Sequence, residues 1–230
     1  MVPNSSVKHP YYPQDIALPH YVPNDKELSV LLGGMFGSVG LFMVFTWFFS
    51  GRSKTKFSTT ERLILCWFMM CGLIHTFLEG YFSLFHATIA GEMTFLAQVW
   101  KEYSKGDSRY LTSDTFVLCM ESITAAIDGP LSFLALVAYF RQSSYRYILQ
   151  LIVSICQLYG DVLYFMTEIK EGFSHGDHGH PLYFWFYFLF MNLIWIVVPI
   201  CLIFHASSHL ADSQSKADQS FKTGRNKKRH

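Results

Sequence analysis

PLYFWFYFLFMNLIWIVVPICLIF, residues 181–204, runs for 24 residues without an Asp, Glu, Lys or Arg. A helix crosses a hydrocarbon core of about 30 Å with roughly 20 such residues, whereas the helices of soluble domains usually carry a polar face. Four other long apolar runs precede this one, at residues 30–50, 63–90, 116–140 and 147–169. The five runs predict an all-α membrane protein with five transmembrane helices.

The composition of the 230 residues agrees with a membrane protein and excludes several other classes. Hydrophobic residues make up 51% and charged residues 15%, against about 25% charge in a soluble domain. These values exclude a disordered chain, a collagen-like repeat and a charge-rich coiled coil. The formal net charge of +1 indicates no nucleic-acid partner. All five cysteines lie inside the apolar runs, so we expect neither a disulfide framework nor a cysteine zinc site.

The charges between the runs predict how the chain lies in the membrane. Of the 18 Lys and Arg residues, twelve fall in residues 51–62, in residues 141–146 and beyond residue 204. Because cytoplasmic loops carry the excess of Lys and Arg, we expect a cytosolic C-terminus and a luminal N-terminus. No basic segment followed by an apolar stretch precedes the first run, so we expect that run to serve as the targeting signal. The chain ends Lys227-Lys228-Arg229-His230, which resembles a dilysine retrieval signal and favours the endoplasmic reticulum membrane.

These features divide the chain into a polar N-terminal segment (1–29), a five-helix transmembrane domain (30–206) and a basic cytosolic tail (207–230). No internal repeat is visible, which weakens the interpretation as a transporter, because many transporters show such duplication. The longest connection, residues 91–115, contains alternating charges and aromatic residues. This pattern is typical of a surface helix or lid, although an ordinary solvated loop has the same composition.

Motifs for cofactors and metals are missing from the sequence. No GxGxxG or Walker loop indicates a nucleotide site, and no GxSxG indicates a nucleophile elbow. The segment SHGDHGH at 174–180 has three histidines but no HExxH pattern or cysteine partner. We therefore expect neither a cofactor nor a metal site.

Titratable side chains inside two of the runs are the main candidates for chemistry. A charge in the middle of a span costs roughly 2.5–3.5 kcal/mol on insertion scales, so it needs a partner or a function. His75 and Glu79 lie four residues apart on one helical face, a spacing at which a carboxylate orients an imidazole. Glu121 lies in the next run, with Thr124 and Asp128 three and seven positions after it on one stripe. Opposed acid–base groups in a dry pocket can protonate one carbon and deprotonate another.

Protonation of an alkene forms a carbocation, which needs electron density close by. Trp195, near the middle of the last run, can supply the face of its indole ring. A buried polar residue in a membrane helix usually links helices, and this is the structural interpretation of Gln157 and Glu168. The same interpretation and a role in the pocket remain open for Asp161 and Asn192.

Seven motifs are spread over residues 9–205. They are HPY at 9–11, YVPND at 21–25, His75-x3-Glu79-Gly80, WKEYSKGDSRY at 100–110, MESITA at 120–125, QLYGDVLY at 157–164, and residues 181–192 followed by Trp195. In this order they resemble the emopamil-binding protein family, the sterol Δ8–Δ7 isomerases of the endoplasmic reticulum. The resemblance implies a five-helix fold, commonly a homodimer in membrane lipid, whose pocket accepts a sterol. It also implies binding of cationic amphiphilic drugs, because an ammonium group mimics the carbocation.

The resemblance further implies migration of the sterol double bond from C8–C9 to C7–C8, by protonation at C9 and loss of a C7 proton. It assigns proton transfer to His75, Glu79 and Glu121, and the lining of the pocket with stabilisation of the cation to Thr124, Asn192 and Trp195. We expect His75, oriented by Glu79, to donate and Glu121 to accept, and the two roles can be exchanged.

One residue departs from the family pattern. Asp128 precedes Gly129-Pro130, where an apolar residue or Trp is expected. It is a harmless substitution, a modulator of Glu121 through like charge, or the mark of a paralogue that binds without isomerising, and we favour the first. The further candidates for a pocket or modulating role are Asp128, Tyr103, Asp161 and Tyr164. We therefore expect a sterol isomerase, with a non-catalytic sterol- and drug-binding membrane protein of the same fold as the alternative.

Overall fold

Five helices of the computed structural model, which describes residues 8–227 and their side chains as far as residue 223, are long and apolar enough to cross a membrane. They are Leu28–Arg52, Thr59–Phe85, Thr115–Phe140, Arg146–Lys170 and Pro181–Thr223. The described residues form helices and loops, without a β-strand among them. The prediction of an all-α membrane protein with five spans is confirmed. The predicted retrieval signal at 227–230 lies outside the described side chains.

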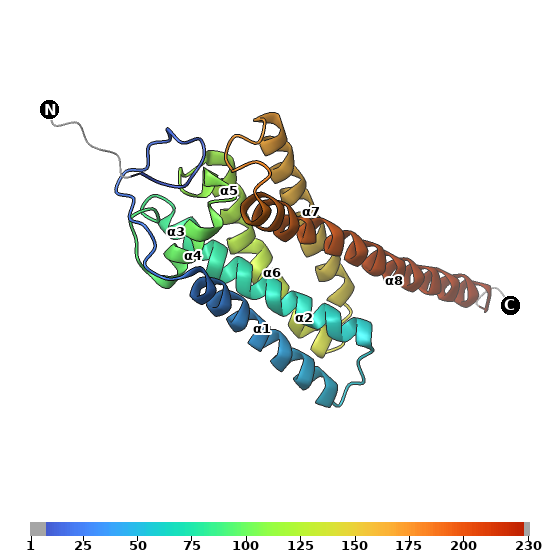
Figure 1. The fold of residues 1–230 in the computed structure, drawn as a ribbon. Coiled ribbons are helices and arrows are strands. Elements are labelled where there is room, and N and C mark those ends of the chain that lie inside the picture. The colour runs from blue at the N-terminus through green and yellow to red at the C-terminus, as the bar shows by residue number, and fades with distance from the viewer. Residues whose placement is uncertain (1–7, 228–230) are drawn as a thin grey trace.

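Neighbouring helices of the bundle follow a simple order (Figure 1). Helix α1 (Leu28–Arg52) packs along α2 (Thr59–Leu73), and α2 packs on α6 (Gly129–Phe140). Helix α6 then packs on α7 (Arg146–Lys170), which lies along α8 (Met191–Lys227). Helix α1 is outermost, and the C-terminal part of α8 projects away from the bundle (Figure 1). Most apolar side chains of α1 are exposed, as expected for a helix that faces lipid rather than a protein core.

Three of the five spans contain a π-helical segment. These segments are η1 (Ile74–Glu79), η3 (Thr124–Asp128) and η4 (Pro181–Phe190). Segment η1 joins α2 to α3 (Gly80–Phe85), and η3 joins α5 (Thr115–Ile123) to α6. Their backbone N–H groups reach carbonyls five residues back, as in Gly80 to His75 and Gly129 to Thr124. Such turns often mark functional sites, because they redirect side chains within a helix.

The segments η1 and η3 pack directly against each other. At this contact Gly129 allows a close backbone approach, since a Cβ atom there would lie 2.9 Å from the backbone nitrogen of Thr76. Pro130 follows in the first turn of α6, where its missing N–H leaves no helical bond unmade. The Gly129-Pro130 pair therefore sets the second span closely against the third span.

The long connection and the N-terminal segment together close one end of the bundle. Helix α4 (Phe95–Tyr103) begins at Thr94, whose hydroxyl accepts the Ala97 N–H at 3.2 Å. Lys101 is fully buried, and its Nζ donates to the carbonyls of Val22 at 2.8 Å and Glu92 at 2.7 Å. Burial lowers the pKa of Lys101 below its ordinary value, because the ammonium loses water. This connection is thus a packed helix of the fold and not a solvated loop.

Candidate functional site

The sequence-predicted pair His75 and Glu79 meets inside the second span. Both residues belong to η1 and are buried, with exposed fractions of 3% and 8%. Nδ1 of His75 lies 2.7 Å and 2.8 Å from the two carboxylate oxygens of Glu79. A carboxylate held this way fixes the orientation of the ring and favours the proton on Nδ1. Nε2, on the opposite side of the ring, is then the nitrogen directed away from the carboxylate.

Thr124 lies between the two predicted carboxyl groups. Its hydroxyl donates to Oε2 of Glu79 at 2.5 Å and lies 3.4 Å from Oε2 of Glu121. Tyr110 donates its hydroxyl to Oε1 of Glu121 at 2.6 Å. Because like charges repel strongly in a site without water, two carboxyl groups and an imidazole this close hold at least one proton between them. The arrangement can therefore give and take protons.

One aromatic side chain, Trp195, and one amide side chain, Asn192, complete this cluster from the last span. The ring centroid of Trp195 lies 4.9 Å from that of His75 and 5.1 Å from that of Trp67. Asn192 accepts from the Tyr103 hydroxyl at 3.2 Å and donates to the carbonyl of Phe188 at 2.6 Å. These bonds hold the amide in one orientation, and the indole face is available to a positive charge that forms near His75.

Sequence reasoning missed two members of the cluster. Gln157 was interpreted as a structural link, but its Nε2 lies 3.0 Å from Nε2 of His75. Tyr110 was noted only within the long connection, yet it is buried against Glu121. Both residues lie in motifs of the resemblance, QLYGDVLY and WKEYSKGDSRY, which was the only signal for them. Their side chains reach the site because spans four and five and the connection fold against spans two and three.

Asp128 does not line either of the two cavities that border this cluster and are described below. It is 1% exposed, and neither carboxylate oxygen has a hydrogen-bond partner among the described residues. The stripe expected for Glu121, Thr124 and Asp128 assumes a regular α-helix. Segment η3 inserts an extra residue into the turn, so a residue seven positions after Glu121 no longer lies on the same helical face as Glu121. Asp128, the residue that departs from the family pattern, therefore lies behind the site and does not line it.

The cluster lies where two cavities meet. The first, about 210 Å³, is bordered by α1, α2, η1, α4 and the last span, and most of its lining side chains are Leu, Met, Phe, Ile, Val and Trp. The second, about 60 Å³, is lined mainly by polar side chains of spans two to five. Five residues line both cavities: Glu79, Tyr110, Glu121, Asn192 and Trp195. Of the further candidates, Tyr103 lines the first cavity, and Asp161 and Tyr164 line the second.

A second buried polar cluster, which we call the ion-pair clasp, consists of Asp107, Arg109, Glu168 and His175. Nη2 of Arg109 lies 2.6 Å from Asp107, and its Nε lies 3.4 Å from Glu168. The two carboxylates raise the pKa of Arg109 above its ordinary value, against the opposing effect of burial. Tyr164 donates to Asp107 at 2.5 Å. The clasp therefore ties the connection around η2 (Ser108–Tyr110) to helix α7.

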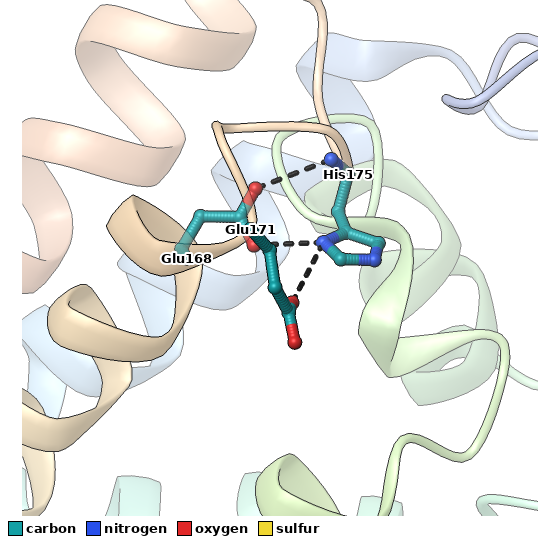
Figure 2. A group of neighbouring side chains, drawn as sticks. All are labelled: Glu168, Glu171 and His175. Atoms are coloured by element: carbon teal, nitrogen blue, oxygen red, sulfur yellow. Dashed lines mark hydrogen bonds and ion pairs between the residues drawn. The ribbon is translucent and has the colours of Figure 1, made fainter.

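Figure 2 shows how the loop after α7 joins the clasp. Nδ1 of His175 lies 2.8 Å from Glu168 and 3.5 Å from Glu171. The potential metal-ligand atoms of these three residues lie within 4.8 Å of one another. However, the same Glu168 oxygen also faces Arg109, so positive side chains already balance its charge. The hydrogen bond to Glu168 raises the pKa of His175, which favours an imidazolium at this position.

Comparisons with known proteins identify the relatives of this chain. The chain matches the family model EBP, described as EXPERA (EXPanded EBP superfamily), over residues 95–206. It is 50% identical over 219 residues to the 3-beta-hydroxysteroid-Delta(8),Delta(7)-isomerase of Rattus norvegicus, with 95% of each chain covered.

Two plant proteins extend these comparisons. A probable isomerase of the same name from Arabidopsis thaliana is 39% identical over 222 residues, with 96% of this chain and 97% of its own covered. The protoglabretal synthase MOI1 of Citrus sinensis is 44% identical over 167 residues, covering 72% and 77%. Because these similarities extend over most of each protein, the chain belongs to the EBP family, the emopamil-binding proteins.

Proposed function

We propose that this protein is a sterol isomerase that moves the nuclear double bond from C8–C9 to C7–C8. The observation that carries the proposal is the buried cluster of His75, Glu79 and Glu121 beside an apolar cavity that Glu79 and Glu121 line. Relatives named 3-beta-hydroxysteroid-Delta(8),Delta(7)-isomerase or probable isomerase of that name support it. An apolar cavity within the membrane suits a sterol, and the reaction needs one acid and one base without a cofactor.

In the proposed reaction His75, oriented by Glu79, gives a proton to C9. The π-electron pair of C8–C9 forms the new C9–H bond and leaves a positive charge at C8. Trp195 faces this charge, since its ring lies beside His75. Glu121 then takes the proton from C7, and the C7–H electron pair becomes the C7–C8 double bond.

The protons balance over one turnover. The substrate gains one proton and loses one, so His75 ends short of a proton and Glu121 holds an extra one. Thr124 and Glu79 lie between these two groups and offer a route for its return. The same geometry supports the opposite assignment, in which Glu121 donates and His75 accepts.

The test is conversion of a Δ8-sterol in deuterated water by membranes that contain the protein or its Glu121→Gln variant. We expect Δ7-sterol with deuterium at C9 from the native protein and little product from the variant. Mass spectrometry reports both the deuterium and the position of the double bond. Unchanged sterol from a folded native protein that still binds a cationic amphiphile would contradict the proposal and identify a non-catalytic binding protein.

The proposal includes a location and an environment for this reaction. The transmembrane domain, residues 30–206, would hold the site within the endoplasmic reticulum membrane, with a luminal N-terminus and a cytosolic C-terminus. The distribution of Lys and Arg supports this orientation. Cationic amphiphilic drugs would occupy the cavity beside Trp195, and membrane lipid would surround a homodimer. Protease protection of tagged termini in sealed microsomes tests the orientation.

A further inference from the structure

Two residues of α7 that line the second cavity, Gln157 and Asp161, each carry a buried acceptor atom without a donor. The two atoms are Oδ2 of Asp161 and Oε1 of Gln157, and neither has a hydrogen-bond partner within the part of the chain that the structure describes. The exposed fractions of the two residues are 8% and 4%. Most buried polar atoms in proteins are paired, so two open acceptors at one cavity indicate a ligand that brings a donor.

The other polar groups of this cavity are already engaged. Glu79 is bonded to His75 and Thr124, and Glu121 accepts from Tyr110. The hydroxyl of Tyr164 donates to Asp107. The amide of Asn192 is held by Tyr103 and Phe188. The amide of Gln157 faces His75, so a hydroxyl that enters the cavity finds its free acceptor on α7 at Asp161.

The position of these acceptors suits one particular end of a sterol. Gln157 contacts His75, and Asp161 follows one helical turn later, roughly 6 Å along the axis of α7. In a 3-hydroxysterol the hydroxyl is on ring A, the ring next to the ring B whose carbon C7 loses a proton. The larger apolar cavity then remains for the rest of the molecule.

We infer that the second cavity is the binding site of ring A and that Asp161 bonds the 3β-hydroxyl of the substrate. Asp161 thereby acts as a specificity-determining residue that places the double bond between His75 and Glu121. This inference rests on the proposed isomerase function. It is consistent with the term 3-beta-hydroxysteroid in the names of the relatives.

The test compares a 3β-hydroxy-Δ8-sterol with its 3-deoxy and 3β-methyl ether analogues, neither of which can donate a hydrogen bond. We expect kcat/KM of the native protein to favour the hydroxysterol roughly 10- to 10³-fold, because an analogue without the donor leaves buried acceptors unpaired. Asp161→Leu should lower the rate for the hydroxysterol toward that of the analogues while leaving the analogue rates nearly unchanged. Asp161→Asn, which keeps a hydrogen-bonding side chain, should retain part of the preference.

Ser154→Ala is the matched control, because Ser154 is buried on the same helix and lines neither cavity. It should preserve the rates for all three sterols. Equal conversion of the three sterols by the native protein would overturn the inference and leave the isomerase function intact, and this comparison does not require a folded variant. A Leu variant that loses activity equally on all sterols would also overturn it, as a structural effect. Conversion of none of them by the native protein would instead contradict the proposed function.

Discussion

The two buried polar clusters of this protein, the acid–base cluster and the ion-pair clasp, differ in charge balance and in access. In the clasp, Asp107 and Glu168 face Arg109 and His175, and none of these four residues lines either cavity. In the acid–base cluster, two carboxyl groups and one imidazole lie next to the cavities, and only Glu79 contacts the imidazole directly. Removal of one partner from a balanced buried pair destabilises a fold, whereas titratable groups gathered next to a cavity are typical of sites that exchange protons.

The sharpest test of this difference is the same substitution in each cluster. Glu79→Gln should reduce Δ7-sterol formation about 10²–10⁴-fold, because the ring of His75 loses the carboxylate that orients it and shares its proton. The thermal unfolding midpoint in detergent should change little. Glu168→Gln should show the reverse, with a lower midpoint and a nearly native rate per folded molecule. Equal losses of activity in both variants would remove the distinction between the clusters.

Arg109→Leu should have the largest effect on stability. Arg109 is 1% exposed and is bonded to Asp107, so its removal leaves a buried carboxylate without a cation. Breaking a buried pair in this way costs about 3–5 kcal/mol. Unfolding in detergent, followed by denaturant titration, measures the loss. Arg141→Leu serves as the control, since Arg141 is exposed, and it should stay within about 0.5 kcal/mol of the native protein. A native-like stability for Arg109→Leu would show that the clasp is dispensable.

Trp195→Leu tests whether the acid–base cluster stabilises a cation. A desolvated cation–π contact contributes about 2 kcal/mol, so its loss should slow isomerisation roughly 30-fold. Trp195→Tyr should retain part of the rate, because it keeps an aromatic face. Trp185→Leu is a matched control, since Trp185 is exposed and lines neither cavity. Equal rates for the Leu and Tyr variants at position 195 would indicate a role in packing alone.

The smallest expected effect is a pH dependence of stability that arises in the clasp. The pKa of His175 is raised in the folded state by its hydrogen bond to Glu168. Its contribution is therefore complete below the unfolded pKa of about 6.5 and is lost as the pH rises through the folded value. The unfolding midpoint should fall over that range, and His175→Gln should flatten the profile. His178 lies in the same loop as His175 and packs on the ring of Phe184 in η4. His178→Gln should therefore keep the pH dependence of the native protein. An unchanged profile in His175→Gln would assign the pH dependence to other groups.

Sequence alone determined the number and position of the spans and the pairing of His75 with Glu79. Both properties are local, because hydrophobic length decides insertion and four residues separate neighbours on a helical face. The predicted spans agree with the helices within several residues, apart from the last, which continues as one helix beyond the membrane-length segment. The uncharged run at 181–204 was sufficient to indicate a membrane protein.

Tertiary structure alone decided which side chains meet across the helices. The π-turns η1 and η3 bring Glu79 to Thr124 and leave Asp128 behind the site, although a regular helix would keep Asp128 on the stripe of Glu121. Tyr110 and Gln157 join the cluster from the connection and from α7. Side-chain periodicity gives the face of one helix, but it contains no information on the rotation of its neighbour or on an inserted residue. Packing settles both, and with them the open acceptor of Asp161 on which the proposed recognition of the sterol hydroxyl rests.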